Sequence, residues 1–223
     1  MAPRDSVIKA VIFDLDGTLV LQKLRIREAK KLLLKRLLEE GVDVGWASIY
    51  TPTEVIIGSI SSRPREFLMR IVDEVFIPYE MEAAEKAELR ESVRDILNEL
   101  RRLGYLLAVA SNNGRAGVMK TLRRTGITPY FNAVITRSDV NAMKPNGKLI
   151  SKTLEVLKVR GEEAVYVGDT IYDVMAAKAA GTKAIAVLGG SHGEELLKNA
   201  DPDLIINGLR RLPEALNLLN PEN

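Results

Sequence analysis

The sequence predicts an α/β protein with a Rossmann-like three-layer core, a parallel sheet between helices, and a small all-α unit inserted after the first strand. Short apolar, β-branched runs alternate with helical segments of about ten residues from Gly104 onward. A similar run lies at residues 7–13, but the stretch that follows it shows helical spacing and no clear strand. We therefore expect the core to comprise residues 1–19 and 86–223, and the helical insert to comprise 20–85.

Within the insert, the apolar spacing predicts a helix over 24–40, followed by a loop-rich stretch that contains Trp46 and Pro52. A second helix is expected over 64–77, because proline is tolerated in a first turn and Pro78 would end the helix. A third helical stretch is expected over 80–103. Gly104 would stop it.

The rest of the chain alternates more regularly. The expected strands are 105–110, 133–136, 164–167, 183–188 and 204–206. The expected helices are 115–124, 147–158, 171–180, 193–199 and 209–219. Apolar strands separated by helices of this length are typical of a parallel sheet whose two faces are both covered by helices.

The amino-acid composition limits the residue types available for catalysis and metal binding. The chain of 223 residues has no cysteine and a single histidine, His192. Cysteine-ligated zinc, iron–sulfur clusters, thiol nucleophiles and histidine-rich metal sites are therefore excluded. Any catalysis must use carboxylates, hydroxyls, lysine and backbone amides.

The balance of acidic and basic residues limits the kinds of partner that the protein is expected to bind. Lysine and arginine number 32 against 30 acidic residues, a net charge of +2, which does not indicate nucleic-acid binding. No apolar run reaches the ~18–20 residues of a membrane span, and residues 1–9 do not resemble a signal peptide. We expect a cytoplasmic protein that binds neither nucleic acid nor membrane, as a monomer or a homodimer.

Polar residues follow the predicted strands at the edge where ligands bind in open α/β sheets. They come from distant segments and comprise Asp14, Asp16, Ser111, Asn112, Lys144, Asp169 and Asp173. Taken singly, these residues could be turn or helix caps. Their convergence on one edge instead indicates a site built from four carboxylates, a hydroxyl and a lysine.

Four segments resemble the motifs of the haloacid dehalogenase superfamily, most of whose members are magnesium-dependent phosphatases. These segments are Asp14-Leu-Asp-Gly-Thr18, Ser111 after an apolar strand, Lys144-Pro145, and Gly168-Asp-Thr-Ile-Tyr-Asp173. They occur in the family's order. The insert is similar to the cap of the phosphoglycolate phosphatase and β-phosphoglucomutase branch.

The resemblance implies three catalytic residues. Asp14 would attack phosphorus and form an aspartyl-phosphate. Asp16 would protonate the leaving oxygen and later deprotonate the attacking water, whereas dehalogenating members lack an aspartate there. Lys144 would neutralise charge on the nucleophile and the phosphate. Ser111, Asn112 and Lys144 would bind the phosphoryl oxygens.

A divalent cation would screen the carboxylate from the phosphate, and hard oxygen ligands favour Mg²⁺. Asp14, the backbone carbonyl of Asp16, and Asp169 would hold the ion. Asp173 would support its waters or orient Lys144. Thr18 and Arg63, the latter in the cap, are the expected substrate contacts.

The expected function is a Mg²⁺-dependent phosphatase that acts on a small phosphorylated metabolite. Phosphoglycolate is the first substrate to test. A β-phosphoglucomutase-like phosphomutase and a pyrophosphatase remain open alternatives. A non-catalytic protein that binds phosphorylated ligands is the alternative from a different class.

Overall fold

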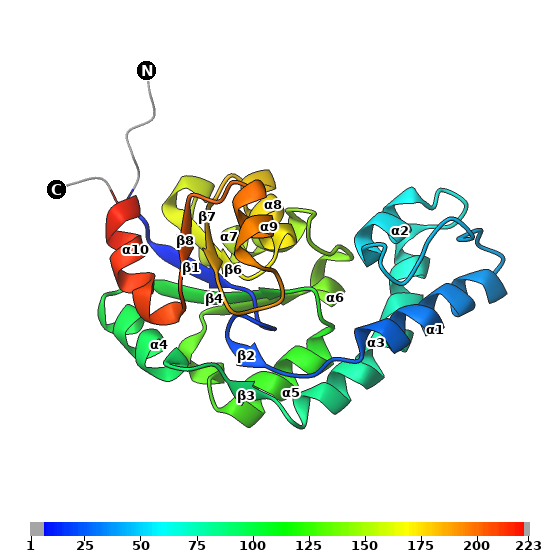
Figure 1. Ribbon diagram of the computed structural model, residues 1–223, viewed down its shortest axis with the longest axis horizontal. Coiled ribbons are helices and arrows are strands. Elements are labelled where there is room, and N and C mark those ends of the chain that lie inside the picture. Colours follow the sequence, from blue (N-terminus) through cyan, green and yellow to red (C-terminus); the bar gives the residue numbers. More distant parts are fainter. Residues whose placement is uncertain (1–6, 221–223) are drawn as a thin grey trace, which may run out of the picture.

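The computed structural model describes residues 7–220 and contains a six-stranded parallel sheet in the order β5-β4-β1-β6-β7-β8 (Figure 1). The strands are β1 (Ala10–Phe13), β4 (Leu106–Ser111), β5 (Ala133–Thr136), β6 (Ala164–Gly168), β7 (Lys183–Val187) and β8 (Leu204–Ile206). The central strand β1 pairs with both β4 and β6. All six strands therefore end at one edge.

Helices cover both faces of the sheet, because successive side chains of a strand point to opposite sides. Val11 and Phe13 pack in one apolar cluster, whose helices are α4 (Val93–Arg102), α5 (Arg115–Thr125) and α10 (Leu212–Leu219). Ala10 and Ile12 pack in the other, whose helices are α7 (Lys148–Leu157), α8 (Ile171–Ala179) and α9 (Glu194–Asn199). The predicted three-layer α/β core is confirmed.

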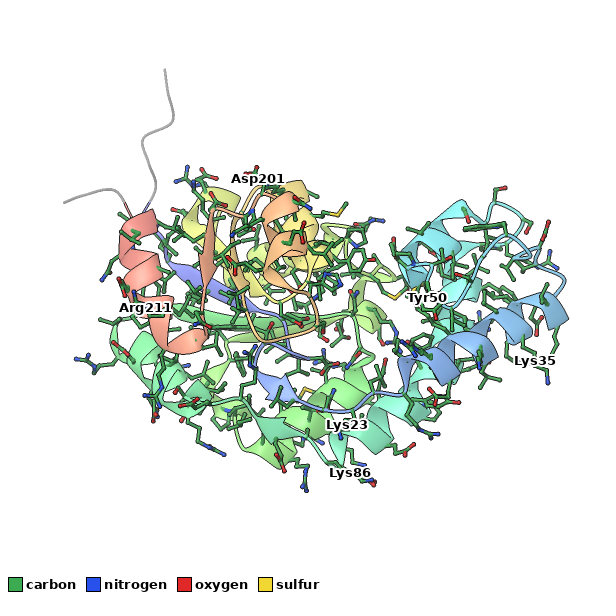
Figure 2. The ribbon with its side chains drawn as sticks, viewed as in Figure 1. Lys23, Lys35, Tyr50, Lys86, Asp201 and Arg211 are labelled. Carbon is green, nitrogen blue, oxygen red and sulfur yellow. The ribbon has the colours of Figure 1, made fainter. Side chains whose placement is uncertain are left out.

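Three helices extend beyond the sheet and pack around a separate apolar cluster (Figure 1). They are α1 (Ile26–Glu39), α2 (Thr53–Ser59) and α3 (Arg65–Ala84). Leu33, Leu68 and Val72 are fully buried in this cluster. Polar residues of α1 lie on its outer side, as Lys35 does in Figure 2. None of the described helices meets the length and apolarity needed to cross a membrane.

The expectation that a helix ends at Pro78 is wrong. The α3 helix continues through Pro78 to Ala84. A proline inside a helix removes one backbone hydrogen bond and costs about 3 kcal/mol. The burial of Val75 and Phe76 before it and Glu80 after it keeps both halves packed against the molecule, which offsets that cost.

The expectation of a single helix over 80–103 is also wrong. Between α3 and α4 lies the short strand β3 (Glu88–Leu89), which pairs antiparallel with β2 (Val20–Leu21). The two strands form where the chain leaves the core and where it returns. Strands of two residues are too short to produce a recognisable alternation of apolar and polar residues. Helix α2 lies in the stretch expected to be loop-rich, and the one-turn helix α6 (Arg137–Val140) lies between the expected strand 133–136 and the expected helix 147–158.

Candidate active site

The loops at the carboxyl edge of the sheet bring the predicted polar residues together. Asp14 follows β1 directly, and its N–H donates to the carbonyl of Val167 in β6 at 2.9 Å. This bond continues the β1–β6 ladder by one residue and places the Asp14 carboxylate beside the loop that carries Asp169. Asp14 and Asp169 are both buried.

Lys144 lies at the centre of the charged groups. Its Nζ contacts Asp14 Oδ1, Asp173 Oδ1 at 2.6 Å and the Tyr166 hydroxyl at 2.8 Å. Burial lowers the pKa of Lys144, but the carboxylates of Asp14 and Asp173 outweigh it and hold the pKa well above its usual value. The side chain is therefore a charged ammonium when it faces the two carboxylates.

Three buried carboxylates meet at this point. Asp14, Asp169 and Asp173 each offer an oxygen, and these oxygens lie within 4.8 Å of one another. Burial raises the pKa of Asp14 well above its usual value; Lys144 opposes that rise, and the neighbouring acids add to it. Three carboxylates carry more negative charge than the single Lys144 ammonium can neutralise. Such a group of oxygen donors suits a hard divalent cation such as Mg²⁺. Asp173, expected to support the ion's waters or to orient Lys144, belongs to the same group of carboxylates.

Asp173 has a second structural role. Its Oδ2 accepts hydrogen bonds from the Thr170 N–H at 2.9 Å and the Thr170 hydroxyl at 2.6 Å. The Thr170 hydroxyl in turn caps the first turn of α8. Because one carboxylate oxygen is fixed by the helix start, the other is held toward Lys144. This geometry supports the expectation that Asp173 orients the lysine.

Asp16 has both carboxylate oxygens engaged. Asn113 Nδ2 donates to Oδ2 at 2.6 Å, and Gln22 Nε2 donates to Oδ1. Burial raises the pKa of Asp16 to about 6, although the Asn113 hydrogen bond acts to lower it. A carboxyl group with a pKa in this range can both donate and accept a proton near neutral pH.

The loop after β4 is shaped by its own side chains. The Ser111 hydroxyl accepts from the Asn113 N–H at 3.2 Å and is buried. Asn112 Oδ1 accepts from the Lys144 N–H at 2.6 Å, and its Nδ2 donates to the Lys144 carbonyl at 3.3 Å. The Asn112 side chain therefore anchors the backbone of Lys144. These contacts support a positioning role for that side chain more than its expected contact with phosphate.

The two residues expected to contact substrate, Thr18 and Arg63, contact other groups of the protein instead. Thr18 is fully buried, and its hydroxyl donates to Asp169 Oδ1 at 2.9 Å. This contact orients a carboxylate of the cluster. Arg63 donates to the Glu40 carbonyl at 3.1 Å, at the end of α1, and is not brought into the cluster. Neither set of contacts supports direct binding of substrate.

Several residues of the site were not predicted. Tyr166 bridges Lys144 to the Ala110 carbonyl at 2.8 Å, and Gln22 reaches Asp16 from the residue after β2. The sequence could have indicated Tyr166, because it lies near the end of a predicted strand, close to the edge where the polar residues gather. Nothing in the sequence indicated the role of Gln22, because its position depends on the short pairing of β2 with β3.

Comparisons with known proteins agree with this geometry. Residues 11–187 match the haloacid dehalogenase-like hydrolase family. A protein of Bacillus cereus (strain B4264) named pyrophosphatase PpaX is 28% identical over 220 residues, which cover 96% of this chain and 98% of that protein.

Solved structures share the fold over nearly the whole chain. A haloacid dehalogenase-like hydrolase from Streptococcus pneumoniae superposes with a TM-score of 0.69 at 23% identity, covering 94% of this chain and 98% of that one. A protein from Haemophilus somnus described as a predicted phosphoglycolate phosphatase gives 0.65 at 20% identity, covering 94% and 98%. The family match spans every residue of the carboxylate cluster, which confirms the resemblance and the expectation of an enzyme. The chain belongs to the haloacid dehalogenase-like hydrolases.

Proposed function

We propose that this protein is a Mg²⁺-dependent phosphatase that hydrolyses a small phosphorylated substrate through an aspartyl-phosphate on Asp14. The observation that carries the proposal is the contact of Asp14 with Lys144 beside two further buried carboxylates. A lone ammonium among three acids leaves a net negative site that would repel phosphate. A site of this composition therefore requires a bound cation to accept an anionic substrate.

The residues fit that cation. Asp14, Asp169 and Asp173 supply buried carboxylate oxygens close enough for one ion to reach, and the backbone carbonyl of Asp16 would add a further oxygen. When bound, the ion would neutralise charge on the nucleophile and on the transferred phosphoryl group.

The chain's own groups account for the remaining chemistry. A carboxylate oxygen of Asp14 attacks phosphorus, and the bond between phosphorus and the leaving oxygen breaks. Asp16 gives its proton to that oxygen. Water then attacks the phosphorus of the aspartyl-phosphate while Asp16 takes the water's proton. The bond between phosphorus and the Asp14 oxygen breaks, inorganic phosphate is released and the Asp14 carboxylate is regenerated. The Ser111 hydroxyl and the Lys144 ammonium bind the phosphoryl oxygens.

Helices α1–α3 have their own apolar cluster, which supports assigning residues 20–85 to a cap that covers the site. Such a unit can exclude water and select the group attached to phosphate. Pyrophosphate and phosphoglycolate are the two substrates to compare first. The relative from Bacillus cereus is named for the former, and the Haemophilus somnus structure for the latter.

The test is phosphate release from pyrophosphate, 2-phosphoglycolate and a panel of sugar phosphates, with and without Mg²⁺. The variant Asp14→Asn removes the proposed nucleophile. Asp201→Asn is the matched control, because Asp201 is exposed and pairs with Lys178 on the surface. We expect Mg²⁺-dependent release that is lost in Asp14→Asn and retained in Asp201→Asn.

Two results would overturn the proposal. Release that persists at the wild-type rate in folded Asp14→Asn would exclude Asp14 as the nucleophile. No release from any ester by a folded protein that binds Mg²⁺ would exclude a phosphatase, and the phosphomutase assay and phospholigand binding would then be measured.

A further inference from the structure

Arg90 lies in the return segment between β3 and α4, outside the four sequence motifs. Its guanidinium donates to two backbone carbonyls, that of Gly17 and that of Leu188 at 2.8 Å. Its own N–H donates to the Leu19 carbonyl at 3.0 Å. One side chain thus joins the loop after β1 to the loop after β7, two segments that lie far apart in the sequence.

These two loops hold Asp169 between them. From the first loop, the Thr18 hydroxyl donates to Asp169 Oδ1 at 2.9 Å. From the second, the Ser191 N–H donates to Asp169 Oδ2 at 2.6 Å. Each carboxylate oxygen is therefore oriented by a different loop.

Close packing makes the position of Asp169 sensitive to both loops. A Cβ atom on Gly17 would lie 2.3 Å from Asp169 Oδ2, and one on Gly190 would lie at the same distance from that oxygen. The carboxylate is thus in contact with a glycine on either side. Gly189 adopts a φ of +82°, and a Cβ there would lie 3.0 Å from the Arg90 guanidinium. The loop after β7 can pass this close to Arg90 and Asp169 because the consecutive residues Gly189 and Gly190 have no side chains there.

We propose that Arg90 is a positioning residue for the metal site: by joining the two loops that enclose Asp169, it holds that carboxylate in the geometry that binds the divalent cation. The planar fork of a guanidinium can donate to two carbonyls at once, whereas a lysine ammonium is a point donor on a flexible stem. The inference rests on the proposed metal site.

The experiment measures the dissociation constant of Mg²⁺ by isothermal titration calorimetry in the full chain. Arg90→Met removes both donors and the charge, and Arg90→Lys keeps the charge without the fork. Arg94→Met is the matched control, because Arg94 also donates to two carbonyls, those of Thr125 and Gly126, at the opposite end of α5 from the site. Thermal denaturation of each variant reports folding separately.

Replacing a residue that orients a metal ligand typically weakens metal binding by 10–100-fold, and Arg90 acts one step further out, so we expect a dissociation constant raised about 10-fold in both Arg90 variants. Arg94→Met should bind Mg²⁺ as the wild type does. A role confined to general stability would lower the melting temperature of the Arg90 variants and leave the dissociation constant unchanged.

Three results would overturn the inference. Wild-type Mg²⁺ affinity in Arg90→Lys would show that the fork is not needed. Tighter binding in Arg90→Met would show that Arg90 acts through its positive charge alone. A wild-type protein that binds no Mg²⁺ would overturn the proposed metal site itself, an outcome that the wild-type titration distinguishes from the other two.

Discussion

At the scale of single residues, one buried ammonium lies among three buried carboxylates and offsets part of their negative charge. Lys144 contacts Asp14 and Asp173, and the carboxylate of Asp169 lies beside them. Desolvation of ions is costly in the interior, and removal of one partner leaves the others uncompensated. The same charge that stabilises the folded site therefore serves the proposed chemistry, in which negative charge grows on the phosphoryl oxygens.

The first prediction concerns Lys144. Lys144→Met should lower kcat by about 10²–10³-fold, the usual effect of deleting one preorganised donor to a developing anion. Lys144→Arg should not restore activity, since a planar guanidinium cannot occupy the space between Asp14, Asp173 and Tyr166 as an ammonium does. Steady-state kinetics at saturating substrate would check both. Wild-type kcat in Lys144→Met would contradict the role assigned to the lysine.

The second prediction concerns pH. The pKa of Asp16 is raised to about 6, mainly by burial, so its carboxyl loses the proton that the leaving oxygen needs as pH rises through that value. The rate of phosphoenzyme formation should therefore fall about tenfold per unit above that pKa. Single-turnover measurements with an alkyl phosphate would show the decline. p-Nitrophenyl phosphate is the control, because its leaving group needs little protonation and the decline should be weaker. An equal decline for both substrates would argue against Asp16 as the acid.

At the scale of elements, α3 is joined to the core by a buried ion pair. Arg137 at the start of α6 contacts Glu80 on α3, and both side chains are almost fully buried. Arg137 also donates to Asp73 on α3 at 2.8 Å and to the Asn112 carbonyl at 2.9 Å. Glu80 Oε2 accepts from the Gly114 N–H at 2.9 Å. The loop that carries Ser111 is thus fixed to the helical unit by charge-assisted hydrogen bonds.

The third prediction tests that ion pair. Glu80→Gln should destabilise the protein by about 3–5 kcal/mol, because it leaves a buried guanidinium without its main partner. Glu85→Gln is the matched control at the end of the same helix, where the exposed pair with Lys120 should contribute about 0–1 kcal/mol. Urea denaturation gives both values. Equal effects of the two changes would contradict a special role for the buried pair.

The fourth prediction concerns Pro78. Pro78→Ala should stabilise the protein by about 1–3 kcal/mol, since alanine restores the missing backbone donor within α3 and removes the steric clash. Thermal denaturation would show a higher melting temperature. A lower one would mean that the packing of α3 depends on the bend that proline imposes.

The elements also show what sequence can reveal. The strands and helices of the core were predictable because buried parallel strands are continuous apolar runs, and the order of four motifs placed Asp14, Ser111, Lys144 and Asp169. The continuation of α3 beyond Pro78 could not be predicted, because burial of the helix in the folded protein outweighs the tendency of proline to end a helix. The ion pair of Arg137 could not be predicted either, because its partner Glu80 lies 57 residues away and has no distinguishing sequence context.

At the scale of the whole molecule, the helical unit is held against the core at both ends of α3. Arg65 in its first turn donates to the Asn141 carbonyl at 2.6 Å and pairs with Glu54 of α2. Glu54 also accepts from the Met143 N–H at 3.0 Å, next to Lys144. The segment that positions Lys144 is therefore in contact with the helices proposed to cover the substrate.

The fifth prediction concerns the effect of Mg²⁺ on stability. A ligand that binds only the folded state stabilises it, so Mg²⁺ at about ten times its dissociation constant should raise the melting temperature by about 3–6 °C. Asp169→Asn should abolish the rise, and Asp201→Asn should retain it. An unchanged rise in Asp169→Asn would place the cation elsewhere.

The proposed mechanism depends on phosphorylation of Asp14. The most direct measurement is an acid quench of the protein during turnover of ³²P-labelled substrate with Mg²⁺, followed by digestion and identification of the labelled peptide. We expect label on the peptide that contains Asp14, lost on treatment with hydroxylamine and absent from Asp14→Asn. Phosphate release by the wild type without a trapped phosphoenzyme, or label on a peptide that lacks Asp14, would contradict it.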